Sequence, residues 1–322
     1  MEAAQAGDRL TARPTVPTGR FAPSPTGPLH IGNLRTAVLA WLFARSAGSP
    51  FLLRIEDLDR AASREEHVRA HLDDLGALGI DWDGDVVRQS DRFDRYEAAL
   101  ARLDADGLLY PCYCTRREVQ AAVAAPHGPS PEGAYPGTCR DLTAAERAAR
   151  EADGRRPSWR ARAEGERVVV VDRLHGPYAG LVDDFVVRRA DGAPAYQIAV
   201  VVDDEDQGVG EVVRGDDLLD STPRQVWLAR RLDVTAPAYA HVPLVLGPDG
   251  QRLAKRHGAI TLADLRDQGV EPPVVLGAMA ASLGLAPAGA AVASVTELVA
   301  AFDPDRLPAA PWRFGLPLGV NM

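Results

Sequence analysis

The sequence predicts an α/β protein built on a parallel sheet, with an inserted, metal-stapled α+β subdomain and a small helical region at its C-terminal side. Three observations lead to this prediction. From residue 20 to residue 110, short apolar runs alternate with helical patterns, which is typical of parallel sheets whose strands are joined by helices. All three cysteines lie between residues 112 and 139, and residues 246–322 read as short helices and loops.

Composition restricts the class of protein. The 322 residues are 46% hydrophobic and 25% charged, which excludes a disordered chain and predicts a globular one. The net charge of −9 provides no global basic field, so any RNA partner must bind a local patch. Lys255 is the only lysine among 36 basic residues, which suggests a position where arginine does not serve. A lysine retained by chance is the simpler alternative.

Targeting signals are not expected. Residues 1–18 read as a flexible leader, with an acidic second residue and no apolar core of the kind found in signal peptides. Residues 272–296 carry no charge, but their Ala and Gly content and Pro287 favour two packed helices over a membrane span. An odd, clustered cysteine count favours a metal site in a reducing compartment. We therefore expect a cytoplasmic protein without membrane contact.

The expected elements begin at residue 20. Residues 20–22 form a first strand, and the Pro/Gly turn at residues 23–28 leads into a helix. One face of that helix carries Leu34, Val38 and Leu42. The second strand, Phe51–Ile55, ends in Glu56 and Asp57. Acidic side chains at a strand end are expected at the carboxyl edge of the sheet, where ligands bind in such folds.

Two further helices are expected before the cysteines. Ser63 and Glu66 have the spacing of a capping box, for a helix that stops at Gly79. The next helix starts near Ser90 and ends at Gly107. Its buried residues are expected to be Phe93, Tyr96, Leu100 and Leu103.

The alternation of strand and helix patterns ends at Pro111, and segments that read as strands return at residues 195–202 and 210–214. A helix at residues 224–232 and a strand at residues 242–246 follow. The expected organisation is therefore a leader (1–18), the first half of a catalytic core (19–110), an insertion (111–190), the second half of the core (191–245) and a C-terminal loop and helical region (246–322).

The first strand, turn and helix form the most informative motif, from Arg20 to Asn33. Such a turn aims the helix N-terminus at the carboxyl edge of the sheet, where backbone N–H groups and the helix dipole attract phosphate. Gly27 and Gly32 leave room for a nucleotide, and His30 supplies an imidazole donor. A histidine that only caps the helix is the alternative, and the twelve-residue context favours the nucleotide site.

Lys255 lies in a second motif, the glycine-punctuated segment from Gly250 to Gly258. A solvated basic loop is one interpretation. The other is a cationic lid that closes on polyphosphate and stabilises the charge that develops as pyrophosphate leaves.

Together the two motifs resemble the HIGH and KMSKS signatures of class I aminoacyl-tRNA synthetases. The sequences of residues 20–27, 54–57 and 213–218 are similar to those of the glutamyl branch of this family. The resemblance covers residues 19–265 and implies a Rossmann-type catalytic core. Two departures stand out: Asn33 where the family often has histidine, and Arg252 and Ala254 in place of the first lysine and the serine of the second motif.

The length of the chain indicates which members of this family it resembles most. Glutamyl-tRNA synthetases carry an additional anticodon-binding domain that is not expected here, so the chain resembles the glutamyl-queuosine tRNA(Asp) synthetases. That resemblance implies ATP-dependent formation of glutamyl-adenylate and transfer of glutamate to queuosine in the anticodon loop of tRNA(Asp). Implied partners are L-glutamate, ATP with Mg²⁺, and the tRNA, bound by a monomer. The alternatives are a short glutamyl-tRNA synthetase that charges a tRNA 3′ end and a non-catalytic tRNA-binding module.

The cysteines supply three thiolate ligands for one structural Zn²⁺, which takes four ligands: Cys112, Cys114 and Cys139. Donor chemistry alone favours His127 as the fourth ligand. The resemblance instead implies Tyr135, which lies four residues before the last cysteine.

The remaining site residues follow from the resemblance. Catalysis is implied for His30 and Lys255, and ATP binding for His30, Gly32 and Lys255. Glu56 is implied to hold the α-amino group of glutamate, because an ammonium needs an anionic partner. The full set implied for glutamate is Arg20, Phe21, Ala22, Pro23, Ser24, Glu56, Tyr196 and Arg214. For Glu56 and Arg214 alone, an ordinary ion pair at a strand end is the alternative.

Overall fold

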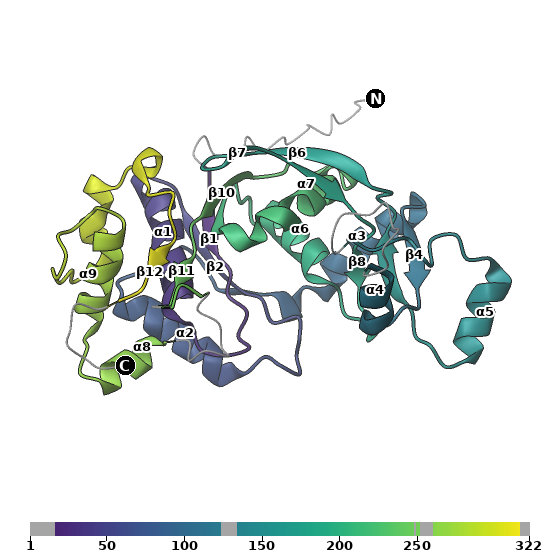
Figure 1. Cartoon of the computed structure of the whole chain (residues 1–322), viewed down its shortest axis with the longest axis horizontal. Helices are drawn as coiled ribbons and strands as arrows, with labels where there is room; N and C mark the ends of the chain where they lie inside the picture. The colour runs from purple at the N-terminus through teal and green to yellow at the C-terminus, as the bar shows by residue number, and fades with distance from the viewer. Residues whose placement is uncertain (1–16, 124–133, 248, 252–259, 316–322) are drawn as a thin grey trace, which may run out of the picture.

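The computed structural model describes residues 17–123, 134–247, 249–251 and 260–315. The molecule is elongated, with α9 (Pro272–Ser282) near one end and α5 (Ala144–Ala152) at the other (Figure 1). None of the described helices has the length and apolarity that a bilayer-spanning segment requires. The uncharged residues 272–296 instead form α9, a loop and the start of the short 3-10 helix η4 (Val295–Ala301).

A parallel sheet lies at the centre, as the sequence predicts. β1 (Gly19–Phe21), β2 (Phe51–Ile55) and β3 (Val87–Arg88) pair in parallel, in the order β1-β2-β3. On the other side, Thr18 bridges to Val209 beside β9 (Glu211–Gly215), and β9 pairs in parallel with β10 (Ala238–Val242). The strands therefore run side by side in the order β3-β2-β1-β9-β10, and their carboxyl ends share one edge.

Helix α1 (Ile31–Ser46) packs against this sheet and is the centre of the largest apolar cluster. The sequence predicts a single apolar face, and the three residues of that face are indeed buried. However, the helix is buried on nearly all sides, because β1 and β9 cover one side while η4 and β11 (Val245–Leu246) cover others. Even Arg35 is 1% exposed and bonds to Ser282 of α9 and to the Pro243 carbonyl.

The predicted capping box at Ser63 and Glu66 is wrong. Helix α2 (Glu65–Ala77) begins after Arg64, which is extended and makes no side-chain cap. The path of the chain is fixed by tertiary contacts instead: the Arg64 N–H donates to the Pro25 carbonyl at 3.0 Å, and the Ser63 N–H donates to the Asp59 carbonyl at 2.9 Å.

Helix α3 (Phe93–Ala105) begins three residues later than predicted, because the 3-10 helix η1 (Gln89–Asp91) precedes it. Tyr96, Leu100 and Leu103 are buried as predicted, whereas Phe93 is half-buried. Arg60 lies over the Phe93 ring, 5.0 Å from its centroid, which accounts for part of the cover.

The predicted strand at residues 195–202 is also wrong, because Tyr196–Asp206 form helix α6. Ile198, Val200 and Val201 are buried, as they would be in a strand, but the buried acidic pair Asp203 and Asp204 continues the helix. A short apolar run does not distinguish a buried strand from a buried helix by its periodicity. The strand predicted at residues 210–214 is present as β9.

The region after Pro111 combines strands and helices. An antiparallel sheet forms from β4 (Leu109–Cys112), β5 (Ser158–Ala161) and β8 (Val186–Arg188). The hairpin of β6 (Glu166–Asp172) and β7 (Gly176–Val182) joins the sheet of β9 and β10 through β6 and β10. The helices of this region are α4 (Arg116–Val123) and α5. The predicted division at residue 190 remains a prediction, and the β6–β7 hairpin shows that the insertion also extends the core sheet.

The C-terminal side consists of short elements, as predicted. The 3-10 helix η2 (Asp216–Ser221) leads into α7 (Thr222–Arg231), which starts two residues earlier than expected. β11 pairs in parallel with β12 (Trp312–Arg313) beside α1. The other elements are α8 (Leu262–Asp267) and the 3-10 helix η5 (Pro304–Arg306).

Candidate active site

A cavity of about 450 Å³ lies where β1, β2 and β9 end and α1 begins. This is the carboxyl edge of the parallel sheet, where α/β folds bind ligands. The cavity brings together segments that are far apart in the sequence, from residue 20 to residue 245. Its lining includes all eight residues implied for glutamate, together with His30 and Gly32: Arg20, Phe21, Ala22, Pro23, Ser24, Glu56, Tyr196 and Arg214. Lys255 lies outside the described residues, as do Arg252 and Ala254.

His30 is both a helix cap and part of the cavity lining. Its Nδ1 accepts the Asn33 N–H at 3.2 Å, and the Asn33 side-chain oxygen accepts the His30 N–H at 3.2 Å. The capping interpretation is therefore confirmed, and the nucleotide-binding interpretation stays a prediction. A neutral imidazole that accepts at Nδ1 carries its proton on Nε2, so Nε2 is the donor of the ring. Asn33, a departure from the family pattern, supplies the reciprocal half of the cap.

Gly32 allows this histidine conformation. A Cβ at position 32 would lie 2.9 Å from two atoms of the His30 ring, closer than such atoms approach. The ring can therefore lie against the first turn of α1 only because residue 32 has no side chain. The N–H of Ile31 is already engaged by the Ile260 carbonyl at 3.0 Å, which attaches the start of α8 to the start of α1.

Under the cavity, Arg54 forms a buried ionic network. Its side chain is fully buried and donates to Asp204 and Gln207, at 2.8 Å each, and to Glu56 at 3.2 Å. Arg20 lies 3.5 Å from the same Asp204. Buried charges are tolerated when they are paired in this way. The network fixes Glu56 and Arg20 from behind, on the side away from the cavity.

Burial and the neighbouring arginines shift the pKa of Glu56 in opposite directions. Burial raises the pKa of this carboxyl, and the Arg54 and Arg20 charges only partly offset the rise, so the pKa lies above its usual value. An ammonium group placed in the cavity would favour the ionised form. A ligand cation and Glu56 therefore stabilise each other.

Arg214 enters the cavity from the end of β9 with most of its donors in use. Nε donates to His241 Nε2 at 3.1 Å, Nη2 donates to Thr222 Oγ1 at 2.8 Å, and Nη1 lies 3.4 Å from the Tyr196 hydroxyl. Tyr239 lies under the guanidinium, with the Arg214 Cζ 5.4 Å from the ring centroid. These contacts therefore fix the orientation of the Arg214 guanidinium on three sides.

The sequence reasoning did not identify the supporting residues Asp203, Asp204, His241 and Asp172. Arg54 opens the motif at residues 54–57, and an arginine inside an apolar strand is a signal of a buried ion pair. Asp203 accepts from Tyr96, Gln89 and Arg92, and thereby joins α3 to the network. Asp203 belongs to an acidic pair that directly follows an apolar run. Such a pair is unusual in a surface helix, and it could have indicated the buried ionic network.

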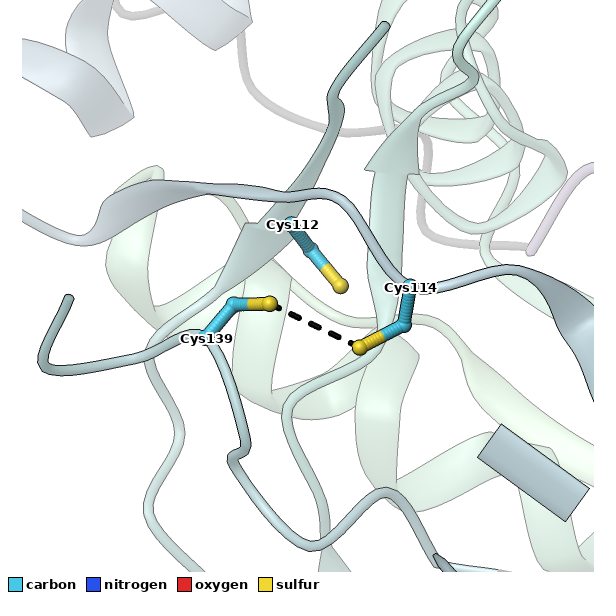
Figure 2. Close-up of side chains that lie close together, drawn as sticks. All are labelled: Cys112, Cys114 and Cys139. Carbon is cyan, nitrogen blue, oxygen red and sulfur yellow. Dashed lines mark hydrogen bonds between the residues drawn. The ribbon is translucent and has the colours of Figure 1, made fainter. Parts of the chain in front are cut away.

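The three cysteines form a second site, away from the cavity. Their Sγ atoms lie within 4.8 Å of one another, and those of Cys114 and Cys139 are 3.5 Å apart. Figure 2 shows the three side chains converging on one small space. A zinc ion bonded to sulfur at about 2.3 Å in a tetrahedron places its sulfurs roughly 3.8 Å apart. The thiol cluster has the dimensions for such an ion.

Tyr135 lies at the open side of this cluster. Its hydroxyl is 3.3 Å from the Cys112 Sγ and 3.7 Å from the Cys114 Sγ, and it accepts the Cys139 N–H at 2.9 Å. Arg160 covers the ring, with its Cζ 3.7 Å from the centroid. The competing ligand His127 lies outside the described residues.

The surroundings favour an anionic sulfur at Cys112 but not at Cys114, where burial and the Cys112 charge raise the thiol pKa to about 12. Burial alone would raise the pKa of the Cys112 thiol, but the Tyr135 hydrogen bond and the Arg160 charge outweigh it and lower that pKa below its usual value. Thiolate is the form that binds metal. Among the described residues, the donor set therefore fits a zinc ion.

Comparison with known proteins identifies the family. The model for tRNA synthetases class I (E and Q), catalytic domain, matches residues 16–316. The chain belongs to this family. The synthetase is 61% identical over 294 residues to the glutamyl-Q tRNA(Asp) synthetase of Nocardia farcinica, a match that covers 91% of this chain and 92% of that protein. These relationships place the synthetase among the ligases.

Other relatives are longer. The synthetase is 46% identical to glutamate-tRNA ligase 1 of Alkalilimnicola ehrlichii over 287 residues, which cover 88% of this chain but 60% of that protein. It also resembles the crystal structure of a glutamate tRNA ligase from Elizabethkingia meningosepticum in complex with its amino acid. That match has a TM-score of 0.76 and 27% identity, and it covers 92% of this chain and 67% of the other. The predicted class I fold is therefore confirmed.

Proposed function

We propose that the synthetase activates L-glutamate with ATP and transfers it to queuosine in the anticodon loop of tRNA(Asp). The observation that carries the proposal is the charge pattern of the cavity: two arginines and one buried carboxylate beside the first turn of α1. The named Nocardia relative, aligned over most of both chains, supports the choice of acceptor.

The charge pattern matches an amino acid with two carboxylates. Arg20 and Arg214 supply two guanidinium groups, which bind carboxylates through paired N–H donors. Glu56 supplies the single anion for the α-ammonium group. A neutral side chain in the substrate would leave one buried cation without its partner, which is unfavourable. We infer that glutamate is therefore preferred to glutamine.

The N-terminus of α1 is the proposed phosphate site. The α-carboxylate of glutamate attacks the α-phosphorus of ATP, the bond to the β-phosphate oxygen breaks, and glutamyl-adenylate and pyrophosphate result. His30 Nε2–H and the first turn of α1 donate to oxygens that gain negative charge. No protein nucleophile is required, because positioning and charge stabilisation suffice for phosphoryl chemistry. Mg²⁺ bound with ATP supplies further positive charge, and Lys255 is the cation proposed for the leaving pyrophosphate.

The thiol cluster is proposed to hold one structural zinc, with Cys112, Cys114, Tyr135 and Cys139 as ligands. It lies on β4 and the following loops, apart from the cavity lining. The apolar cluster around it is small and consists of tyrosines and the cysteines themselves. A metal ion would therefore supply cohesion that apolar packing does not.

A second acceptor deserves a direct test, because relatives named glutamate-tRNA ligase also match well. Transfer to a tRNA 3′ end requires the terminal adenosine, whereas transfer to a base does not. We expect radiolabelled glutamate to attach to queuosine-containing tRNA(Asp) even after its terminal adenosine is removed. Attachment that disappears with the adenosine would instead show charging of the 3′ end.

The reaction itself is tested by ATP–pyrophosphate exchange. We expect exchange with L-glutamate and not with L-glutamine, followed by transfer to tRNA(Asp) that contains queuosine. Matched tRNA(Asp) with unmodified guanosine is the control and should accept no glutamate. Absence of exchange with any amino acid, together with tRNA binding, would contradict the proposal and favour a binding module. Sedimentation of the purified protein tests the proposed monomer.

A further inference from the structure

Behind Arg214 lies a buried histidine–aspartate pair that the proposed chemistry does not use. His241 on β10 is 0% exposed and Asp172 at the end of β6 is 1% exposed. The His241 Nδ1 is 2.6 Å from an Asp172 oxygen, and its Nε2 is 3.1 Å from the Arg214 Nε. Neither residue belongs to the described lining of the cavity. They act on the cavity only through Arg214.

The direction of each hydrogen bond follows from what the groups can do. An arginine Nε–H only donates, so His241 Nε2 must accept from it. A neutral histidine that accepts at Nε2 carries its proton on Nδ1. Asp172 accepts that proton's hydrogen bond, along with the N–H groups of Leu174, His175 and His241. Asp172 therefore stabilises the one tautomer that can hold Arg214.

We propose that Asp172 and His241 are positioning residues that direct the Arg214 guanidinium into the cavity and so determine the affinity for a carboxylate of the substrate. With Nε bound to His241 and Nη2 bound to Thr222, the side that carries Nη1 is turned toward Tyr196 and the cavity. This inference rests on the proposed function, because it takes the carboxylate to be that of glutamate.

Asp172, His241 and Arg214 together form what we call the clamp, and its geometry makes it sensitive to acid. A protonated His241 has no acceptor for Arg214 and places a second cation against it. Burial lowers the His241 pKa, as do the charges of Arg214 and His175, while Asp172 raises it, and the net direction is downward. Asp216 on η2 also faces this histidine, Tyr239 stacks on it and Thr222 lies 3.1 Å from Nε2. The clamp is thus intact at neutral pH and opens in acid.

The first test compares two substitutions of the histidine. In His241→Gln, the side-chain oxygen keeps an acceptor near the Nε2 position and removes the titration; in His241→Leu, the acceptor is lost. We expect His241→Leu to raise the dissociation constant for glutamate at least tenfold while that for ATP changes less than twofold. His241→Gln should remain within about threefold of the wild type. A general structural defect would weaken both ligands and would not be rescued by glutamine.

The pH profile separates the clamp from Glu56, which also titrates in the cavity. Glutamate affinity of the wild type should fall with acidification, and part of that fall should be missing in His241→Gln, where only Glu56 remains. If the two profiles coincide, His241 does not gate the site.

Asp172→Asn provides a variant in which the histidine is intact. An amide cannot accept at every position that the carboxylate serves, so the Nδ1–H tautomer loses its support. We expect weaker glutamate binding and a shift of the His241 ring nitrogen signals in long-range ¹H–¹⁵N spectra. In the His241→Gln background, Asp172→Asn should add little. His175→Gln is the matched control, because the His175 ring bonds to the His241 carbonyl at 3.0 Å and acts on the His241 ring through its charge alone.

The outcomes are distinguishable. If the wild-type protein binds no glutamate, the proposed function fails and the inference fails with it. If the wild type binds glutamate and all three variants bind it equally well, only the inference is overturned. Normal folding and ATP binding in every variant, with weaker glutamate binding in His241→Leu and Asp172→Asn but not in His241→Gln, would support the inference.

Discussion

The cavity and the thiol cluster hold polar groups inside the protein in different ways. The cavity relies on paired charges from β1, β2 and α6, with Arg54 bonded to three partners at once. The thiol cluster draws on one short stretch, residues 112–139, and has few apolar neighbours. The cavity is stabilised by elements from across the fold, whereas the cluster is proposed to depend on a single ion.

This difference shows how each region should fail. Removing one charge in the network leaves its buried partners without compensation, but the surrounding sheet and helices remain. Removing one thiol from a structural metal site removes the ion and the folding free energy that its binding contributes. Five predictions test or refine this contrast, beginning with the largest effect.

Cys112→Ser should have the largest effect on stability. The variant should lose the bound zinc and on the order of 5 kcal/mol or more of apparent stability at saturating zinc. Metal analysis should find one zinc per wild-type chain and none in the variant, and calorimetry should show a lower Tm. A chelator should have the same effect on the wild type.

Two matched variants identify the fourth ligand. Tyr135→Phe should weaken zinc binding, because its hydroxyl lies beside two of the thiols. His127→Ala should leave zinc unchanged. The reverse pattern would show that histidine, the donor favoured by simple ligand chemistry, is the ligand.

Arg54→Met should destabilise the protein by about 3–5 kcal/mol, because Glu56 and Asp204 would remain buried without their cation. Glutamate binding should weaken as well, since Glu56 would be ionised less readily. Arg45→Met is the control: it removes an arginine that pairs at the surface with Asp81 and Asp83, for which less than about 1 kcal/mol is expected. Denaturant unfolding measures both, and equal losses would contradict the distinction.

The contrast between the regions also explains what the sequence could predict. The turn from residue 20 to residue 33 predicted β1 and the start of α1, because these features are local, whereas the cap at His30 was only the alternative to a nucleotide site. The thiol cluster was equally accessible, since cysteine spacing reports on a local site. In both cases the residues that act together are neighbours in the chain.

The features that the sequence did not predict depend on contacts outside such local motifs. The run at residues 195–202 suits a strand, yet it forms part of α6 because it packs between α3 and α7 and carries Asp203 and Asp204 to Arg54. The Ser63 capping box failed because the Asp59 carbonyl takes the Ser63 N–H that Glu66 would have to bind, and the helix begins only after Arg64. His241 could not have been predicted, because its role depends on a strand pairing between β9 and β10.

Asp74 on α2 is an exception to the paired charges of the sheet region. It is 8% exposed, and burial raises its pKa to about 6, with Arg266 opposing the rise and Asp73 adding to it. Because the folded state binds this proton more tightly than the unfolded state, the contribution to stability is present below about pH 4. It is lost as the pH rises toward 6.

Asp74→Asn should therefore raise the free energy of unfolding at pH 7 by about 2 kcal/mol and leave it nearly unchanged at pH 4. The exposed neighbour gives the control, and Asp73→Asn should show little change at either pH. Urea unfolding at the two pH values measures the difference. A gain that is the same at both pH values would show that packing, rather than titration, is responsible.

The smallest effect concerns function alone. The other 35 residues of the 36 lysines and arginines are arginine, and we infer that the lysine at 255 stands where a planar fork does not replace a point charge. We expect Lys255→Arg to lower the rate of adenylate formation at least about tenfold, or about 1.4 kcal/mol of barrier. The loss should fall on kcat more than on KM, as for a contact that strengthens in the transition state. Stability should be unchanged, in contrast to Arg54→Met. Near-normal pyrophosphate exchange in Lys255→Arg would mean that the lysine is a remnant of composition, and the charge on the departing phosphates would then have to be stabilised by His30 and the N-terminus of α1.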